Sequence, residues 1–89
     1  MKKHVRVYMA HYGYGEQDFV PCEACRSMGR TAVRAVDVHH IDGRLGESAN
    51  TIGNLIGLCR NHHIAAHTGK ISATELKEIV DKRRTGDDG

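Results

Sequence analysis

The sequence predicts a small α+β domain held together by a metal ion, and three observations support this fold class. The chain has 89 residues, 39% of them apolar, and no Trp, so its hydrophobic core must be thin and needs a staple. Three cysteines and several histidines recur at metal-ligand spacings. Short β-branched runs alternate with segments of helical periodicity. We therefore expect one domain over residues 1–84 and a flexible tail over residues 85–89.

The first element is expected to be a helix, because apolar side chains recur at helical spacing at Val5, Tyr8, Met9 and Tyr12. The apolar residues at positions 5, 7 and 9 also alternate as they would in a strand, which leaves that alternative open. Gly13 begins a glycine-rich turn that should end this element.

A pair of strands followed by a helix is expected in the middle of the chain. Residues 31–41 are rich in Val and Ala, which favours extended structure, and residues 55–58 form a second short apolar run. Residues 42–53 contain three glycines and should form an irregular loop between the two strands. His63 and His67 are four residues apart and would share one face of the helix that follows.

The last helix is predicted over residues 72–84. Ser72 and Glu75 have the spacing of a capping box, and an apolar stripe follows them. No apolar run approaches the roughly 18 to 20 residues of a spanning helix, and the N-terminus lacks an apolar signal core. These two absences predict a soluble protein without a membrane partner. Three cysteines cannot all pair as disulfides and have the spacing of a metal site, so we expect a reduced, cytoplasmic protein.

A structural zinc site is the first functional prediction. Cys22 and Cys25 form a C-x-x-C pair in a predicted knuckle over residues 19–28, and Cys59 and His62 repeat the same spacing. Four protein ligands close a tetrahedral Zn²⁺ site, which in so short a chain would contribute folding free energy directly. The alternative is three buried or reactive free thiols.

A second group of histidines is expected to carry the chemistry. His39 and His40 are adjacent in a predicted strand, so their side chains point to opposite faces and one can bind a metal while the other stays free as a base. His63 and His67 could complete a site with His39, with coordination positions left open for water and substrate. The alternatives are histidines packed within the core or on the surface, or ligands of a second structural zinc.

The charge distribution agrees with a polyanionic partner without requiring one. The formal net charge is +2, and residues 1–70 hold nine Lys or Arg against six Asp or Glu. This positive excess lies in the region of the metal ligands and would suit a nucleic acid. An ordinary solvated surface explains it equally well.

Together these motifs resemble a known family. An Asp-Val-His-His-Ile segment from Asp37, an Asn54-Leu55 pair after a glycine-rich loop, and the pattern Cys59-x-x-His62-His63-x-x-x-His67 resemble the HNH endonucleases. Their catalytic unit is the ββα-metal fold, also called the His-Me finger. With the knuckle ahead of the His-His pair, the chain looks like small zinc-stapled HNH proteins of bacteriophages and prophages. The resemblance covers residues 18–67 and implies a ββα-metal core over residues 33–68 with flanking helices.

The resemblance assigns catalytic roles to four histidines. His40 matches the general base that takes a proton from the water attacking a phosphodiester. His39 and His63 match metal ligands, and His67 matches an additional helical ligand found in part of the family. Relatives commonly carry a further cysteine where this chain has His62, so His62 and His63 could exchange their places in the two sites.

Four further residues are expected to have supporting roles, of which only that of Asn54 is implied by the resemblance. Asn54 matches the central asparagine, which is expected to brace the loop between the strands and to orient the base. Asp37 is expected to accept a hydrogen bond from a ligand histidine or to approach the metal itself. Arg44 and Arg60 would hold phosphates, although solvated surface arginines are equally expected at both positions.

The implied function is hydrolysis of phosphodiester bonds in DNA, by nicking or by cleavage of both strands, with double-stranded DNA as the expected substrate. The implied cofactors are a structural Zn²⁺ and one catalytic divalent cation, Mg²⁺ or Mn²⁺, with Ni²⁺ or Zn²⁺ also compatible with histidine ligands. The resemblance further suggests a bacterial or phage-infected host cell, a packaging protein such as terminase as a partner, and a homodimer. The alternative is a zinc-stapled module that binds nucleic acid or protein without cutting.

The remaining histidines and the tyrosines receive no catalytic role from the sequence. His4 and His11 lack partners in the sequence and are expected to be surface or packing residues. The three tyrosines are expected to be core or surface aromatics in preference to platforms for stacked bases.

Overall fold

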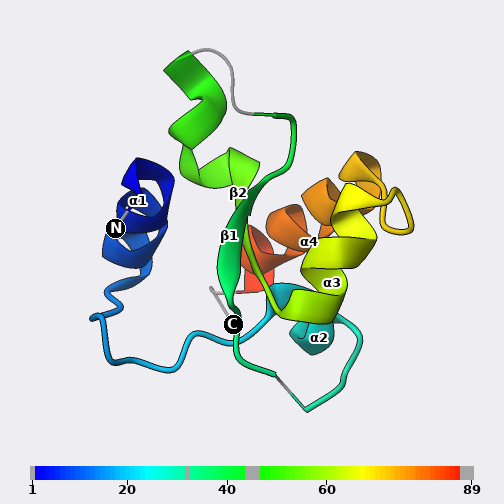
Figure 1. Cartoon of the computed structure of the whole chain (residues 1–89), viewed down its shortest axis with the longest axis horizontal. Helices are drawn as coiled ribbons and strands as arrows, with labels where there is room; N and C mark the ends of the chain where they lie inside the picture. The colour runs from blue at the N-terminus through cyan, green and yellow to red at the C-terminus, as the bar shows by residue number, and fades with distance from the viewer. Residues whose placement is uncertain (1, 32, 44–46, 87–89) are drawn as a thin grey trace.

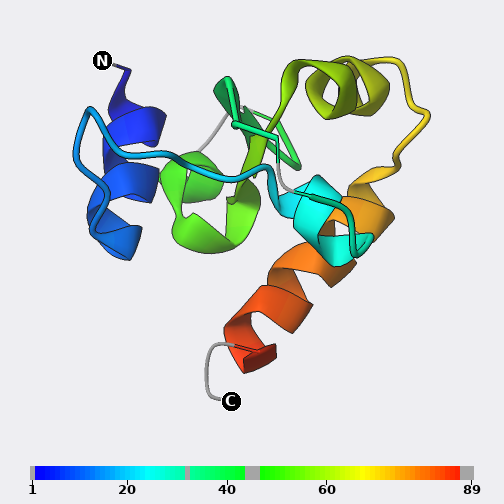
Figure 2. The same ribbon diagram turned by 90° about the horizontal axis from the view of Figure 1, so that it is seen from below.

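A two-stranded antiparallel sheet lies at the centre of the protein, between helices on its two sides (Figures 1 and 2). The computed structural model describes residues 2–31, 33–43 and 47–86. The expected α+β class is confirmed in this arrangement of one small sheet and surrounding helices. None of the helices within these ranges combines the length and apolar character that crossing a bilayer requires.

The sheet consists of β1 (Asp37–His40) and β2 (Leu55–Leu58). Their register pairs Asp37 with Leu58 and His39 with Ile56, so these four side chains share one face. Val38 and His40 point to the opposite face with their own partners on β2. β2 has the bounds expected from its apolar run, whereas β1 is shorter than the extended segment expected over residues 31–41.

Helix α1 (Lys3–Tyr12) covers the face of the sheet that contains Val38 and His40. Tyr8 is buried there beside Val38, which agrees with the helical interpretation of the apolar spacing. The helix ends at Gly13, whose φ of 71° lies in the left-handed region that favours glycine.

The main hydrophobic core lies on the other face of the sheet. It is formed by the helices α2 (Glu23–Ser27), α3 (Arg60–His67) and α4 (Ala73–Gly86) packed against β2. Ile56 and Leu58 of β2 belong to the same cluster as Leu76 and Val80 of α4, and all four are almost completely buried. Two of the metal-ligand cysteines of the knuckle belong to the same core.

The helix caps follow the sequence closely. The Ser72 hydroxyl accepts a hydrogen bond from the Glu75 amide at 3.1 Å, and the Glu75 carboxylate accepts one from the Ser72 amide at 3.3 Å. This is the reciprocal arrangement of a capping box. Helix α4 continues to Gly86, two residues beyond the expected end, because neither Thr85 nor the preceding arginines interrupt a helix as proline would. Of the expected tail, residues 87–89 lie outside the described residues.

The loop between the strands contains two short 3₁₀ helices that the sequence did not reveal. These are η1 (Glu47–Asn50) and η2 (Ile52–Asn54), in a segment expected to be irregular. Glycines and polar residues suggested a loop without periodicity, and single turns of 3₁₀ helix are too short to leave a periodic pattern.

A buried ion pair between Glu23 and Arg83 connects four elements. The Glu23 carboxylate accepts hydrogen bonds from Tyr8 Oη at 2.6 Å and from the Gly57 amide at 2.9 Å. Arg83 Nη1 donates to both oxygens of the same carboxylate at 2.6 and 2.7 Å. The Arg83 guanidinium also donates to the carbonyl oxygens of Leu55 and Ile52. Residues from α1, α2, β2 and α4 are thereby tied to one carboxylate.

Candidate metal centres

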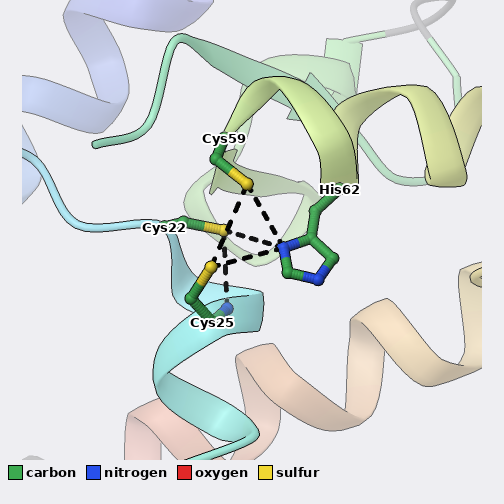
Figure 3. A group of neighbouring side chains, drawn as sticks. All are labelled: Cys22, Cys25, Cys59 and His62. Carbon is green, nitrogen blue, oxygen red and sulfur yellow. Dashed lines mark hydrogen bonds between the residues drawn. The ribbon is translucent and has the colours of Figure 1, made fainter. Parts of the chain in front are cut away.

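Three cysteines and one histidine converge in the first candidate centre (Figure 3). Cys22 precedes α2 as its N-cap and Cys25 lies within that helix. Cys59 is the N-cap of α3, and His62 lies one turn further along it. The two x-x spacings therefore place each pair of ligands at the start of a helix, and the core brings the two helix starts together.

The separations between the ligand atoms suit a tetrahedral metal ion. His62 Nδ1 lies 3.4 Å from Cys22 Sγ, 3.5 Å from Cys25 Sγ and 3.3 Å from Cys59 Sγ. All four ligand atoms lie within 4.8 Å of one another. Bonds of about 2.0 to 2.3 Å to zinc would separate tetrahedral ligand atoms by roughly 3.5 to 4 Å. This buried group could hold a structural metal such as zinc.

The protonation of the thiols depends on their surroundings. Burial raises the pKa of Cys22 to about 11. Burial acts in the same direction on Cys59, but hydrogen bonds from the backbone amides of His62 and Asn61 and the neighbouring thiols outweigh it and lower the pKa. Because Zn²⁺ binds thiolates, loading this group with metal would release protons.

Three histidines form the second candidate centre. His39 lies on β1, and His63 and His67 lie one turn apart on α3, with ligand atoms within 4.8 Å of one another. His63 Nε2 and His67 Nε2 are 3.0 Å apart, and the His39 ring centroid is 5.5 Å and 5.1 Å from theirs. His62 therefore belongs with the cysteines and His63 with the other histidines. The sequence left open whether His62 or His63 lies with the cysteines. In the structure it is His62, and His63 lies four residues before His67 in the other group.

Asp37 supplies a carboxylate beside this group. Its Oδ2 lies 3.5 Å from His63 Nε2, and strand alternation places it on the same face as His39. His63 and Asp37 are 23% and 33% exposed in their side chains, so the group is open to solvent on one side. Three imidazoles and a nearby carboxylate with solvent access can bind a divalent cation and leave room for other ligands.

The His39 imidazole is held in its neutral form. Burial, and then the charges that His67 and His63 would carry when protonated, lower the pKa of His39 to about 4. A neutral imidazole has a lone pair available for a metal ion, so His39 needs no deprotonation near neutral pH.

His40 points away from the other three histidines, to the face covered by α1. It is 9% exposed, and its ring centroid lies 4.3 Å from that of His4. His40 Nε2 and Asn50 Oδ1 are 2.9 Å apart, so the ring is anchored at one nitrogen. The opposite orientations expected for His39 and His40 are present, but His40 is more enclosed than a free base would be.

Asn54 makes the contacts of a loop brace. Its Oδ1 accepts a hydrogen bond from the Asp42 amide at 2.8 Å, and its Nδ2 donates to the carbonyl oxygen of Ala49 at 2.8 Å and to that of Gly43 at 3.3 Å. These bonds span the loop between β1 and β2. The side chain hydrogen-bonded to His40 is that of Asn50, whose Oδ1 accepts from Nε2, so the contact expected between Asn54 and His40 is made by a different asparagine.

Two contacts to His40 could not be assigned from the sequence. Asn50 is ten residues from His40 and lies in an unforeseen 3₁₀ helix. His4 is buried at 7% exposure against His40, so of the two roles considered for it, packing is the one observed. No spacing rule links a residue in the first helix to one in a strand 36 positions later.

The structure describes only one of the two arginines that are expected to hold phosphates. Arg60 is exposed at the first position of α3, directly after the candidate ligand Cys59. Arg44 lies outside the described residues, so that prediction stays a prediction.

Comparisons of the chain with protein-family models, with curated proteins and with solved structures found no match.

Proposed function

We propose that this protein is a metal-dependent endonuclease of the HNH type, which hydrolyses phosphodiester bonds of double-stranded DNA. The observation that carries the proposal is the group of His39, His63 and His67, assembled from a strand and a helix with access to solvent. A hairpin, its connecting loop and a following helix are the parts that a ββα-metal unit requires. The separate cysteine-rich centre supports it, because it leaves these three histidines available for chemistry.

Each residue has a distinct task in the proposed reaction. His39, His63 and His67 would hold one divalent cation, with Asp37 accepting a hydrogen bond from His63 or adding a carboxylate oxygen. When bound, such a cation supplies positive charge to the scissile phosphate and to the oxygen that leaves. The expected products are a 5′ phosphate and a 3′ hydroxyl.

His40 would take the proton from the attacking water. With Nε2 donating to Asn50 Oδ1, the neutral ring has its lone pair on Nδ1, which is the atom that would accept the proton. The side chains of His39 and His40 leave opposite faces of β1. Both can act on one phosphate only when that phosphate lies across the edge of the strand.

Cleavage of supercoiled plasmid by zinc-loaded protein in Mg²⁺ or Mn²⁺ tests the proposal. Wild type should convert the plasmid to nicked or linear forms, and His39→Ala and His40→Ala should each lower the rate by about a hundredfold or more. His11→Ala is the matched control, because His11 is exposed on α1 and belongs to neither centre. Zinc content and circular dichroism of each variant establish that it is folded.

Two results would contradict the endonuclease. One is a wild-type protein that leaves the plasmid intact with either cation. The other is a folded His40→Ala variant that nicks as fast as wild type, which would remove His40 from the reaction.

A second candidate function is a zinc-stapled module that binds DNA or protein without cutting. The enclosure of His40 by His4 and Asn50 favours it, because those contacts also suit a packing histidine. The two candidates differ in one observable. A binding module would retard DNA in a gel equally well with and without the divalent cation and would leave every strand intact.

A further inference from the structure

A cavity of about 410 Å³ opens between residues of α1, α2 and α4. Its volume lies within the range of about 300 to 1,000 Å³ typical of small-molecule sites. None of the seven candidate metal ligands lines it. Any ligand that it binds would therefore occupy a site separate from the proposed catalytic centre.

The walls of this cavity are unusually aromatic for the chain. All three tyrosines of the protein line it, although the protein contains only one Phe and no Trp. The ring centroids of Tyr8 and Tyr12 are 5.0 Å apart, and those of Tyr12 and Tyr14 are 6.1 Å apart. Tyr8 is buried and fixed by its hydrogen bond to Glu23, whereas Tyr12 and Tyr14 are partly exposed. Partly exposed tyrosine rings can stack against a flat ligand.

Three cationic side chains also line this cavity. Arg26 on α2 and Lys82 on α4 are exposed, whereas Arg83 is partly buried with its Cζ 5.2 Å from the Tyr12 ring centroid. The one carboxylate in the lining, Glu23, is neutralised by Arg83 and hydrogen-bonded on both oxygens. The exposed Arg26 guanidinium at the border of the cavity would attract an anion.

Arg83 also has an unused donor. Within the part of the chain that the structure describes, its Nε is the only buried side-chain nitrogen or oxygen without a hydrogen-bond partner. An unsatisfied buried donor costs about 1 to 3 kcal/mol. An oxygen of a ligand that reached Nε would remove this cost.

We infer that this cavity binds a nucleotide unit of a single-stranded nucleic acid, with its base against the tyrosines and its phosphate against the basic side chains. Aromatic faces combined with cations are the recurrent means of holding single strands without reading their sequence. The inference goes beyond the proposed cleavage, since it concerns a second site and requires neither the catalytic cation nor hydrolysis. Either proposal can therefore fail alone.

Intrinsic tyrosine fluorescence tests this inference directly, because every tyrosine lines the cavity and the protein has no Trp. Zinc-loaded protein is titrated, without added divalent cation, with pentathymidylate, thymidine 5′-monophosphate, thymidine or inorganic phosphate. The pentathymidylate should change the emission saturably, and calorimetry should give the same affinity. The monophosphate should bind more weakly than the pentamer. It should bind more tightly than thymidine, which lacks the phosphate, and than inorganic phosphate, which lacks the base, by about tenfold or more.

Substitutions locate the binding. Arg26→Ala and Lys82→Ala should each weaken pentathymidylate binding and reduce its dependence on salt, because each removes a charge near the phosphate. Tyr14→Leu should weaken it by roughly tenfold through lost stacking, measured by calorimetry. Lys70→Ala is the matched control, because Lys70 is exposed beyond α3 and does not line the cavity.

Three outcomes would overturn the inference. The first is the absence of saturable binding of pentathymidylate. The second is binding that the Arg26→Ala, Lys82→Ala and Tyr14→Leu variants all retain unchanged. The third is binding of the free monophosphate without binding of the pentamer, which would mean a site for a free nucleotide instead of a strand.

Discussion

Adjacent residues in this protein have different chemical environments because strand and helix geometry separates them. His39 and His40 leave opposite faces of β1, one toward the partly exposed histidines of α3 and the other toward α1. His62 and His63 are likewise adjacent in α3, but the first faces the cysteines and the second faces His39. A structural group and an open group can therefore share six consecutive residues of one helix.

His4 gives a pH-dependent prediction at the scale of the residue. Burial, and then the neighbouring His40, lower the pKa of His4 below its ordinary value of 6.5. The folded protein then binds its proton less readily than the unfolded chain, so the contribution of His4 to stability is present above pH 6.5 and is lost as the pH falls below it. Replacement by glutamine, which does not titrate, should make the stability of the protein less dependent on pH in this window.

The measurement is denaturant unfolding of zinc-loaded wild type and His4→Gln at pH 7.5 and pH 5.5. One titrating group can contribute at most about 1.4 kcal/mol per pH unit, which bounds the difference between the two slopes. Comparing the two proteins removes the acid sensitivity of the cysteine centre, which they share. Equal slopes for both would show that His4 titrates in the folded protein as it does in the unfolded chain.

At the scale of the element, short segments are positioned by close backbone contacts. Gly57 lies in the middle of β2, where a Cβ atom would come within 2.9 Å of Tyr8 Oη and 3.3 Å of Tyr8 Cζ. The Tyr8 ring cannot yield easily, because its hydroxyl donates to Glu23, which also accepts from the Gly57 amide. The absence of a side chain thus lets α1 pack directly on the strand.

Gly57→Ala should consequently destabilise the protein by about 1 to 3 kcal/mol, the usual cost of overpacking a close contact. Denaturant unfolding would measure the loss. Gly53→Ala is the matched control, because a Cβ atom at Gly53 meets nothing within 4 Å and should change the free energy of unfolding much less. Similar losses for the two substitutions would mean that general backbone effects of glycine, and not the contact with Tyr8, set the stability.

The elements also show what a sequence can reveal about this fold. Leu55–Leu58, the capping box at Ser72 and the helical spacing of His63 and His67 are local patterns, and the structure contains each of them. The ion pair between Glu23 and Arg83 joins residues 60 positions apart, and no local sequence pattern predicts it. The contact between Asn50 and His40 could not be predicted for a similar reason, because it depends on how a non-periodic loop folds.

For the molecule as a whole, α3 links the two candidate metal centres. Cys59 is its N-cap and His62 lies in its first turn, and His63 and His67 follow on the same helix. The hydrophobic core that packs against β2 is small, and its buried members include the three cysteines. A metal in the cysteine centre would therefore hold the start of α3 against α2 and indirectly set the position of the other histidines relative to His39.

Removal of metal from the cysteine centre should then disrupt both centres, whereas loss of the histidine centre should leave the fold intact. Zinc binding contributes about 10 to 16 kcal/mol in small zinc domains, which exceeds the stability of most domains of this size. We expect chelated wild type and Cys59→Ser to lose most helical circular dichroism and to lose Ni²⁺ binding at the histidines. His67→Ala should weaken Ni²⁺ binding yet keep one zinc ion and the wild-type spectrum. A metal-free protein that retained its helical signal and a cooperative thermal transition would show that the apolar core alone sustains the fold.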